Sequence, residues 1–250
     1  MTRTRGSHAQ TELAAYSRDF YSRLERLSGV DIGYYESGSL TLAREGERMV
    51  ELGYALTMAR HHGLPAHALS LSEIARVSPL LEPRGLVGGV LFEGDATVNP
   101  GVATFATAKA AFDRGVRIVE GCRVLGFRLS GSRLTALETD RGTIECEVAV
   151  LAAGLWTRGL ALLAGARVPL HAAEHMWVQT EPVAGASRDL PIVRDLDGRF
   201  YVRHYRGGLV VGAFEPDGKP RPESSIPADF SFAEFAPDWD HFEAPLSRAR

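Results

Sequence analysis

A short apolar segment near the middle of the chain, residues 147–156, constrains the fold more than any other part of the sequence. It reads Glu-Val-Ala-Val-Leu-Ala-Ala-Gly-Leu-Trp, and an apolar run this short that ends in small residues is typical of a buried strand in a parallel sheet. Gly154 has no Cβ, so a ligand or another backbone can approach it closely. With a short helix expected over 157–165, the segment predicts a strand-to-helix turn of the kind at which doubly wound sheets bind nucleotides. On these residues alone, a core strand followed by a tight turn is an equally good interpretation.

Composition limits the class of protein and its partners. The chain has 250 residues, of which 45% are apolar, so it can bury a core as one large or two interleaved domains. A net charge of −3 gives no reason to expect nucleic acid or an anionic membrane as partner, and no apolar stretch approaches the ~20 residues of a membrane span. Residues 1–6 are basic but lack the apolar region of a secretory signal. Two cysteines, Cys122 and Cys146, are expected to be buried and unreactive in strands, which predicts a protein of the reducing cytoplasm.

Apolar spacing and capping residues predict mainly helices before residue 116 and mainly strands after it. An apolar stripe at helical spacing covers residues 13–27, and Gly29 follows as a left-handed C-cap. Further helices are expected over 44–62, after the capping box that Ser70 begins, and from the N-cap Asn99 to residue 115. Two short strands are expected within 33–42. Further strands are expected over 89–92, 116–118, 122–129, 133–138 and 143–150, with long antiparallel strands over 168–215.

Several stretches occur together in an order that carries a resemblance. They are Gly-Asp-Ala-Thr-Val-Asn-Pro at 94–100, Ala-Ala-Gly-Leu-Trp at 152–156, Val-Pro-Leu at 168–170, Glu-His-Met-Trp-Val-Gln-Thr-Glu-Pro at 174–182, Leu-Pro-Ile-Val-Arg-Asp-Leu-Asp-Gly at 190–198 and Gly-Ala-Phe-Glu-Pro at 212–216. Together they resemble the D-amino-acid-oxidase superfamily of flavoproteins, and within it the dimethylglycine and sarcosine dehydrogenase branch. The similarity runs from about residue 11 to residue 220.

The resemblance implies a mixed α/β fold, in which a Rossmann-like FAD-binding domain is interleaved with an antiparallel-sheet substrate domain. Residues 1–30 and 90–167 would belong to the FAD-binding domain, residues 31–89 and 168–220 to the substrate domain, and 221–250 to an irregular C-terminal segment. The family's G-x-G-x-x-G turn, which holds the FAD pyrophosphate, is not found in the sequence. Its Trp-His-Ala stretch and its glycine-rich C-terminal segment are not found either. We therefore expect an incomplete Rossmann-like domain, with the dinucleotide motif on a missing segment or a second subunit.

The same resemblance suggests two catalytic residues, and the chemistry of its side chain suggests a third. His175 matches the family's active-site histidine, although a lone histidine in a strand is more often a core or surface residue. Tyr201 matches a substrate-domain tyrosine near the flavin, where the residues alone suggest sheet packing. Arg203 could bind a substrate carboxylate through two hydrogen bonds, or it could be a cation on a strand face.

Four further residues are expected to contact FAD. In the family, a valine at the position of Val124 offers its backbone to the adenine edge, and the turn formed here by Ala153, Gly154 and Trp156 faces the pyrophosphate and ribose. Packing within a strand is the simpler interpretation of Val124, and both can hold because a backbone contact leaves the side chain free.

The sequence thus predicts an FAD-dependent oxidoreductase that oxidises the C–N bond of a small N-methylated or secondary amino acid to an imine by hydride transfer to flavin. One alternative is a non-catalytic remnant of such an enzyme, and we expect the isolated chain to bind FAD weakly and to be poorly soluble. A second is a zinc hydrolase, because residues 171–175 read H-x-x-E-H. That motif needs a helix to bring both histidines to one face, whereas strands are expected around it, so we expect no metal site. No residue in the chain identifies the substrate further.

Overall fold

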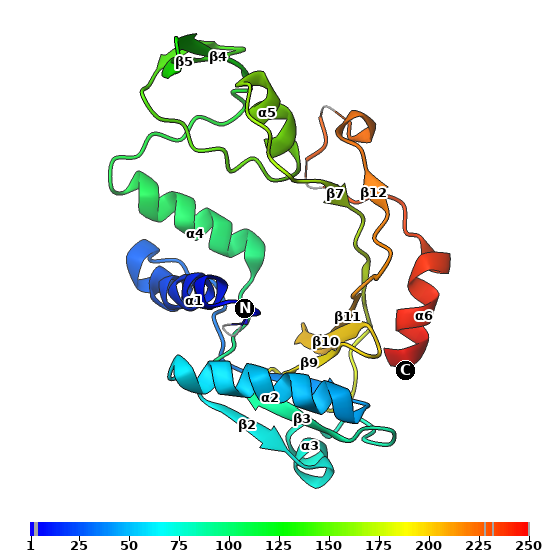
Figure 1. The fold of residues 1–250 in the computed structure, drawn as a ribbon. Coiled ribbons are helices and arrows are strands. Elements are labelled where there is room, and N and C mark those ends of the chain that lie inside the picture. The colour runs from blue at the N-terminus through cyan, green and yellow to red at the C-terminus, as the bar shows by residue number, and fades with distance from the viewer. Residues whose placement is uncertain (3–4, 228, 232, 250) are drawn as a thin grey trace. The chain divides into compact units, whose positions relative to one another are not determined.

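The computed structural model describes residues 1–2, 5–227, 229–231 and 233–249, and the chain forms two compact units. The first unit consists of Met1–Val116, His175–Pro216 and Pro237–Arg250, and the second of Arg117–Glu174 and Asp217–Ala236. Helices and strands are present in both units, so the predicted mixed α/β class is confirmed (Figure 1).

A seven-stranded mixed sheet forms the centre of the first unit, with strand order β2-β3-β1-β9-β10-β11-β8. The strands are β1 (Ser39–Ala43), β2 (Ala66–Leu69), β3 (Gly88–Phe92), β8 (Trp177–Gln179), β9 (Ile192–Asp195), β10 (Phe200–Tyr205) and β11 (Gly208–Ala213). Strands β1 and β9 are parallel and the other neighbours are antiparallel. The sheet therefore joins a segment before residue 93 to a segment after residue 176.

Helices cover the two faces of this sheet differently. On one face, α2 (Gly46–His61) contacts β1, β2 and β3, and its Leu52 and Leu56 pack with Val90 and Phe92. On the other face, α3 (Leu71–Val77) packs near β3, and α6 (Trp239–Ala249) packs on β10 and β11. The face that carries α2 therefore extends beyond that helix, across β9, β10, β11 and β8.

The predicted helix ends in the first unit are mostly confirmed. Helix α1 (His8–Ser28) ends at Gly29, whose φ of 71° is the left-handed conformation that favours glycine. Helix α4 (Pro100–Phe112) begins at Asn99, whose side chain accepts a hydrogen bond from the Val102 N–H at 3.2 Å. The capping box of α3 also forms. Helix α4 ends at Phe112, three residues earlier than predicted, and packs against α1 through small and apolar side chains.

The second unit contains the predicted meander. Strands β4 (Val124–Ser130), β5 (Arg133–Thr139) and β6 (Gly142–Glu145) pair antiparallel in that order. A short 3-10 helix (Gly154–Trp156) and α5 (Thr157–Leu163) follow, and β7 (Ala172–Ala173) pairs with β12 (Pro220–Arg221), before a second 3-10 helix (Glu223–Ser225). The last predicted strand of the meander, 143–150, ends early at Glu145.

The predicted strand before the turn at Gly154 is wrong. Residues 147–153 form no strand, and Val148 and Val150 are 79% and 86% exposed. A parallel strand is held by hydrogen bonds to neighbouring strands, and within the described residues no strand pairs with this segment. An apolar sequence alone does not keep such a segment extended and buried.

Three smaller expectations are also corrected. Residues 116–118 form no strand, because the chain leaves α4 through a turn at Gly115 (φ 86°) and stays irregular. Within 33–42 there is one strand, β1, because Gly33 (φ 64°) and Gly38 (φ 75°) turn the preceding backbone. Cys122 and Cys146 are free and half-buried, since each lies just outside a strand of the exposed meander.

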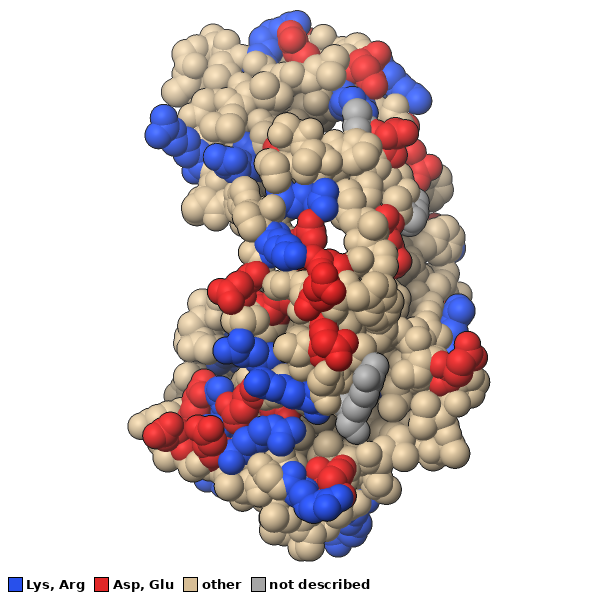
Figure 2. Space-filling model, turned by 90° about the vertical axis from the view of Figure 1, so that its right-hand side faces the viewer, with Lys and Arg blue, Asp and Glu red and all other residues tan. Residues whose placement is uncertain are grey.

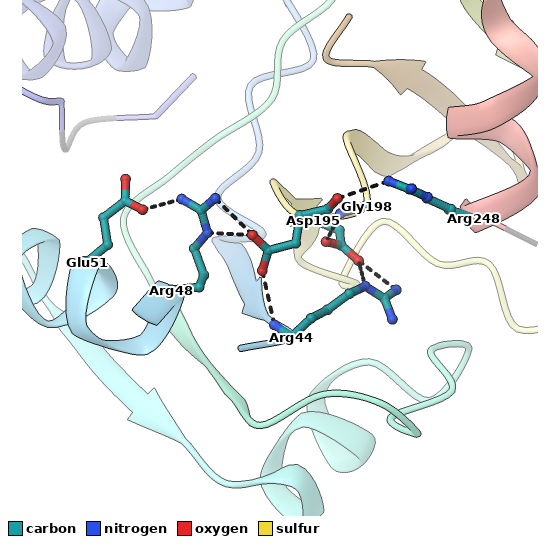
Figure 3. A network of polar contacts seen from close by, with 7 residues as sticks. Arg44, Arg48, Glu51, Asp195, Gly198 and Arg248 are labelled. Atoms are coloured by element: carbon teal, nitrogen blue, oxygen red, sulfur yellow. Dashed lines mark hydrogen bonds and ion pairs between the residues drawn. The ribbon is translucent and has the colours of Figure 1, made fainter. Parts of the chain in front are cut away.

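A network of ion pairs fixes the turn between β9 and β10 (Figure 3). The carboxylate of Asp195 is fully buried and accepts hydrogen bonds from Arg44 Nε at 2.8 Å and the Gly198 N–H at 2.6 Å. Next to it, Asp197 accepts from Arg48 Nε at 2.9 Å and from the Arg44 N–H at 3.1 Å. A Cβ at Gly198 would lie only 2.7 Å from the Asp195 Cγ, so the turn requires glycine there. The network ties β9 to β1 and α2.

Figure 2 shows one face of the molecule, on which acidic and basic side chains are interspersed. No helix among the described residues has the length and apolar character needed to cross a lipid bilayer.

Candidate functional site

One row of side chains crosses the sheet face that extends beyond α2. Each side chain belongs to a residue that is paired with the next one on the neighbouring strand. This pairing places all of them on the same face of the sheet. From β1 to β8 the row is Thr41, Arg194, Tyr201, Gly212 and Trp177. The predicted residue Tyr201 is therefore at the centre of a surface formed by five strands.

Tyr201 is held in place by the glycine opposite it. A Cβ at position 212 would overlap the Cζ, Cε1 and Oη atoms of the Tyr201 ring, so the ring lies directly over Gly212. The ring centroid is 5.5 Å from that of Phe214, a distance at which aromatic rings attract each other. Burial raises the pKa of Tyr201, with Arg203 lowering it and Glu215 raising it further. Its hydroxyl therefore stays protonated and can donate or accept a hydrogen bond.

His175 lies beside Tyr201 and is anchored by a carboxylate that the sequence did not reveal as part of the site. The His175 Nδ1 is 2.8 Å from Glu215 Oε2, and the other oxygen of Glu215 accepts from the Met176 N–H at 3.0 Å. The imidazole ring stacks near the Tyr201 ring, with centroids 6.4 Å apart and planes inclined by 18°. The structure therefore brings two of the three predicted catalytic residues together.

The Glu215 carboxylate is ionised at neutral pH. Its side chain is only 7% exposed, and this burial acts to raise the pKa of Glu215. The Met176 N–H, its own backbone N–H and the His175 ring outweigh burial, and the net pKa is lowered. An ionised carboxylate only accepts hydrogen bonds, so the Nδ1 of His175 must carry the proton. In the neutral imidazole the Nε2 atom is then left as an acceptor.

Arg203, the third predicted catalytic residue, lies two residues after Tyr201 on β10, and the contacts it makes are farther along that strand. Its Nη1 donates to the backbone oxygen of His204 at 3.4 Å, and its guanidinium lies 5.3 Å from the Tyr205 ring centroid. It also lines a cavity together with Val202, a residue of the opposite sheet face that packs near α6.

Arg194 is the cation that lies next to Tyr201. It pairs directly with Tyr201 across β9 and β10, and its guanidinium is 5.8 Å from the Phe214 ring centroid. Burial lowers the pKa of Arg194, and Asp95 partly opposes this effect. Residues 192–195 alternate as a strand, but the sequence does not show which strand they pair with, so Arg194 was missed.

Val124, the predicted adenine contact, is the first residue of β4. The strand order β4-β5-β6 leaves the outer edge of β4 without a neighbouring strand in the described part of the chain. Arg123 directs its backbone toward β5, donating to Asp140 Oδ1 and accepting from the Asp140 N–H, each at 3.0 Å. In an antiparallel strand, the N–H and C=O groups of one residue point to one edge of the strand and those of the next residue point to the other edge. The N–H and C=O groups of Val124 therefore face the open edge of β4. One donor and one acceptor side by side are what the edge of an adenine ring requires.

The other predicted cofactor residues form a tight turn in the same unit. Gly154 has a φ of 54°, the left-handed region that favours glycine. The N–H of Trp156 donates to the Ala153 oxygen at 3.1 Å, and the Trp156 side chain is 37% exposed. Gly154 also lines a cavity of about 300 Å³ together with Arg158 and other residues. The turn is thus formed as predicted, although the strand before it is not.

The H-x-x-E-H stretch does not form a zinc-binding helix. Ala172 and Ala173 lie in β7, Glu174 forms an ion pair with Arg221, and His175 pairs with Glu215. No cluster of three potential metal ligands occurs among the described residues.

Comparisons with known proteins agree with this architecture. The DAO family, described as FAD dependent oxidoreductase, matches residues 2–250. The 4-methylaminobutanoate oxidase (formaldehyde-forming) of Paenarthrobacter nicotinovorans is 44% identical over 246 residues, which are 98% of this chain and 30% of that protein. The mitochondrial sarcosine dehydrogenase of Mus musculus is 32% identical over 254 residues, covering 98% of this chain and 27% of that protein.

A solved structure shows the same fold. The L-proline dehydrogenase of P. horikoshii superimposes with a TM-score of 0.86 at 18% identity, covering 100% of this chain and 64% of that chain. The chain spans about a third or less of the length of the curated relatives described above. Because the family match covers nearly the whole sequence, the chain belongs to the DAO family of FAD-dependent oxidoreductases.

Proposed function

We propose that this chain contributes the substrate-binding sheet of an FAD-dependent oxidoreductase that oxidises the C–N bond of a small N-methylated or secondary amino acid to an imine. The observation that carries the proposal is the pair of His175 and Tyr201 on the sheet face beyond α2, anchored by the buried carboxylate of Glu215. The names of the two relatives, a 4-methylaminobutanoate oxidase and a sarcosine dehydrogenase, support N-methylated substrates.

The residues of the chain have distinct roles in this proposal. FAD, when bound, supplies the hydride acceptor. The Tyr201 hydroxyl positions the substrate by a hydrogen bond, and the Nε2 acceptor of His175 accepts the proton that a substrate ammonium must lose before oxidation. The outward-facing backbone of Val124 would hold the adenine edge, and the turn at Gly154 would lie against the phosphates.

Flavin reduction by substrate tests the proposal. A flavin-loaded protein that contains the whole of this chain is mixed anaerobically with N-methylated amino acids, and bleaching of the flavin absorbance is followed in the parent protein, His175→Gln and Tyr201→Phe. We expect His175→Gln to slow flavin reduction by about 100-fold or more, the lower end for loss of a general acid–base group, and Tyr201→Phe to slow it by about 10-fold, as loss of one hydrogen bond does. The variant Tyr205→Phe, at the end of the same strand, is the control and should reduce flavin at the parent rate. A parent protein whose flavin is not reduced by any such amine would sink the proposal.

A second proposal is that the 250 residues alone are non-catalytic. The segment 147–153 is irregular, with Val148 and Val150 largely exposed, where a strand beside the cofactor was expected. Exposed apolar segments of this kind promote aggregation. Equilibrium dialysis of the chain against FAD tests this reading, and stoichiometric binding with a micromolar or lower Kd would contradict it.

A further inference from the structure

A cavity on the sheet face opposite Tyr201 lies outside the candidate functional site. It has a volume of about 180 Å³, and its lining residues belong to the first unit. Val193 and Val202 in its wall are paired across β9 and β10 and alternate along these strands with Arg194 and Tyr201, so they face the other side of the sheet. The cavity therefore lies on the face that carries α3 and α6.

Apolar side chains form most of the cavity wall. Besides the two valines they include Leu81, Pro191, Phe200 and Leu209. An engineered cavity of about 150 Å³ lined by such side chains stays free of water and binds benzene. The cavity therefore has room for an apolar body of about five or six carbon atoms.

The charged side chains of the wall leave a positive charge unbalanced. Arg44 and Arg248 both line the cavity and both bind the turn between β9 and β10 (Figure 3). Asp195 neutralises Arg44, whereas Arg248 donates to a backbone oxygen at 3.1 Å and forms no ion pair with any residue in the described part of the chain. Glu82, which also lines the cavity, is bound by Arg84. An incoming anion would therefore find a partner in Arg248.

Two uncharged side chains of the wall have hydrogen-bond donors to spare. Ser78 is only 3% exposed, and its hydroxyl makes no hydrogen bond to the residues that the structure describes. His204 accepts a hydrogen bond from the Gly207 N–H through Nε2 at 3.1 Å, so the neutral ring carries its proton on Nδ1. Buried polar groups are normally hydrogen-bonded, and a ligand carboxylate can accept from such donors.

We propose that this cavity is a second ligand site, which binds a small organic acid with its apolar body against β9, β10 and β11 and its carboxylate at Arg248. A carboxylate suits the site better than a neutral polar group, because a guanidinium forms charge-assisted hydrogen bonds with it. The inference is independent of the proposed function, since neither His175, Tyr201 nor Glu215 is among the described residues that line the cavity.

Calorimetry on a flavin-loaded protein that contains the whole of this chain tests the class of ligand. Acetate, butanoate and hexanoate are titrated in turn, and hexylamine serves as a cation of the same length as hexanoate. Each methylene that enters the cavity should tighten binding about fourfold, so hexanoate should bind about 15-fold more tightly than butanoate. Hexylamine should not bind. Absence of hexanoate binding at millimolar concentration, equal affinities for acetate and hexanoate, or equal affinities for hexylamine and hexanoate would each overturn the proposal.

Variants then test whether hexanoate occupies this cavity. Arg248→Gln should weaken hexanoate binding by about 10-fold, as loss of one charge-assisted hydrogen bond does, and Leu209→Trp, which fills the cavity, should abolish it. Near-ultraviolet circular dichroism checks that each variant is folded. Arg248 is exposed, so its replacement tests the site even if the larger change at Leu209 prevents folding.

Two control variants separate this cavity from the rest of the molecule. Arg60→Gln removes an exposed arginine from α2, on the other face of the sheet, and should bind hexanoate as tightly as the parent protein does. Tyr201→Phe should also keep the parent affinity. An unchanged affinity in Arg248→Gln, or weaker hexanoate binding in Tyr201→Phe, would overturn the proposal, the latter by placing hexanoate in the candidate functional site.

Discussion

Replacing Gly212 with alanine is the sharpest structural test of the site. Gly212 faces Tyr201 across β10 and β11, and an added Cβ would overlap three atoms of the Tyr201 side chain. The backbone of a central strand cannot retreat far, because β11 pairs with β10 on one side and with β8 on the other. The Tyr201 ring must therefore leave its position.

The expected loss of stability follows from the contacts that the ring would lose. Overpacking by one methyl group costs about 1–3 kcal/mol, and weakened aromatic contacts of Tyr201 with Phe214 and His175 cost about 0.5–1.5 kcal/mol per pair. Alanine is better than glycine within a strand by about 0.5–1 kcal/mol, which offsets part of this cost. We therefore expect Gly212→Ala to lower the free energy of unfolding by about 1–5 kcal/mol. If Tyr201 positions the substrate, a displacement of about 1 Å should also slow flavin reduction by up to about 100-fold.

Urea unfolding at equilibrium and anaerobic flavin reduction measure the two effects. The matched control is Gly53→Ala on the exposed side of α2, where an added Cβ meets no atom within 4 Å. That variant should gain about 0.5–1 kcal/mol, because alanine is the better helix former. A double-mutant cycle with Tyr201→Ala isolates the clash: once the ring is removed, Gly212→Ala should cost much less. Additive effects, or a Gly212→Ala protein with parent stability and rate, would refute the packing of Tyr201 over Gly212.

Two further variants test the buried carboxylates. Because the folded-state pKa of Glu215 is lowered, its stabilisation is present above the unfolded-state pKa of about 4.3 and is lost as the pH falls through the folded-state value. Urea unfolding from neutral to acidic pH measures the difference in unfolding free energy between the parent and Glu215→Gln. This difference should therefore shrink toward zero in acid. A constant difference would contradict the role of the ionised carboxylate. Asp195→Ala removes the partner of Arg44 and of the Gly198 N–H. We expect the free energy of unfolding to fall by about 3 kcal/mol, the lower end for a broken buried ion pair, because the Arg44 side chain is 36% exposed. A loss below about 1 kcal/mol, as at an exposed pair, would contradict this account.

The features that the sequence predicted correctly are those set by local chemistry. The cap at Gly29 and the N-cap at Asn99 depend on residues within one helical turn, and both formed as expected. The strand over 147–153 depends instead on hydrogen bonds to distant neighbours, and without such neighbours among the described residues an apolar composition does not make it a strand.

The site was predicted only where a family pattern could be matched. His175 and Tyr201 were found in this way and lie side by side. The pairing of β8 with β11 brings Glu215 close to His175, and the pairing of β9 with β10 brings Arg194 next to Tyr201. A single sequence does not show which strands pair or in which register. Glu215 is 40 residues from His175 along the chain, so neither helical nor strand periodicity could connect the two.

Strand β9 links the structural network to the proposed site. Side chains of a strand alternate between its faces, so the direction of Arg194 is fixed once its neighbour Asp195 is fixed. Asp195 is held on the opposite face by Arg44 and by the Gly198 N–H (Figure 3). A one-residue slip of β9 would move Asp195 to the face of Tyr201 and remove Arg194 from it. The buried ion pair therefore sets the register that keeps Arg194 on the face of Tyr201.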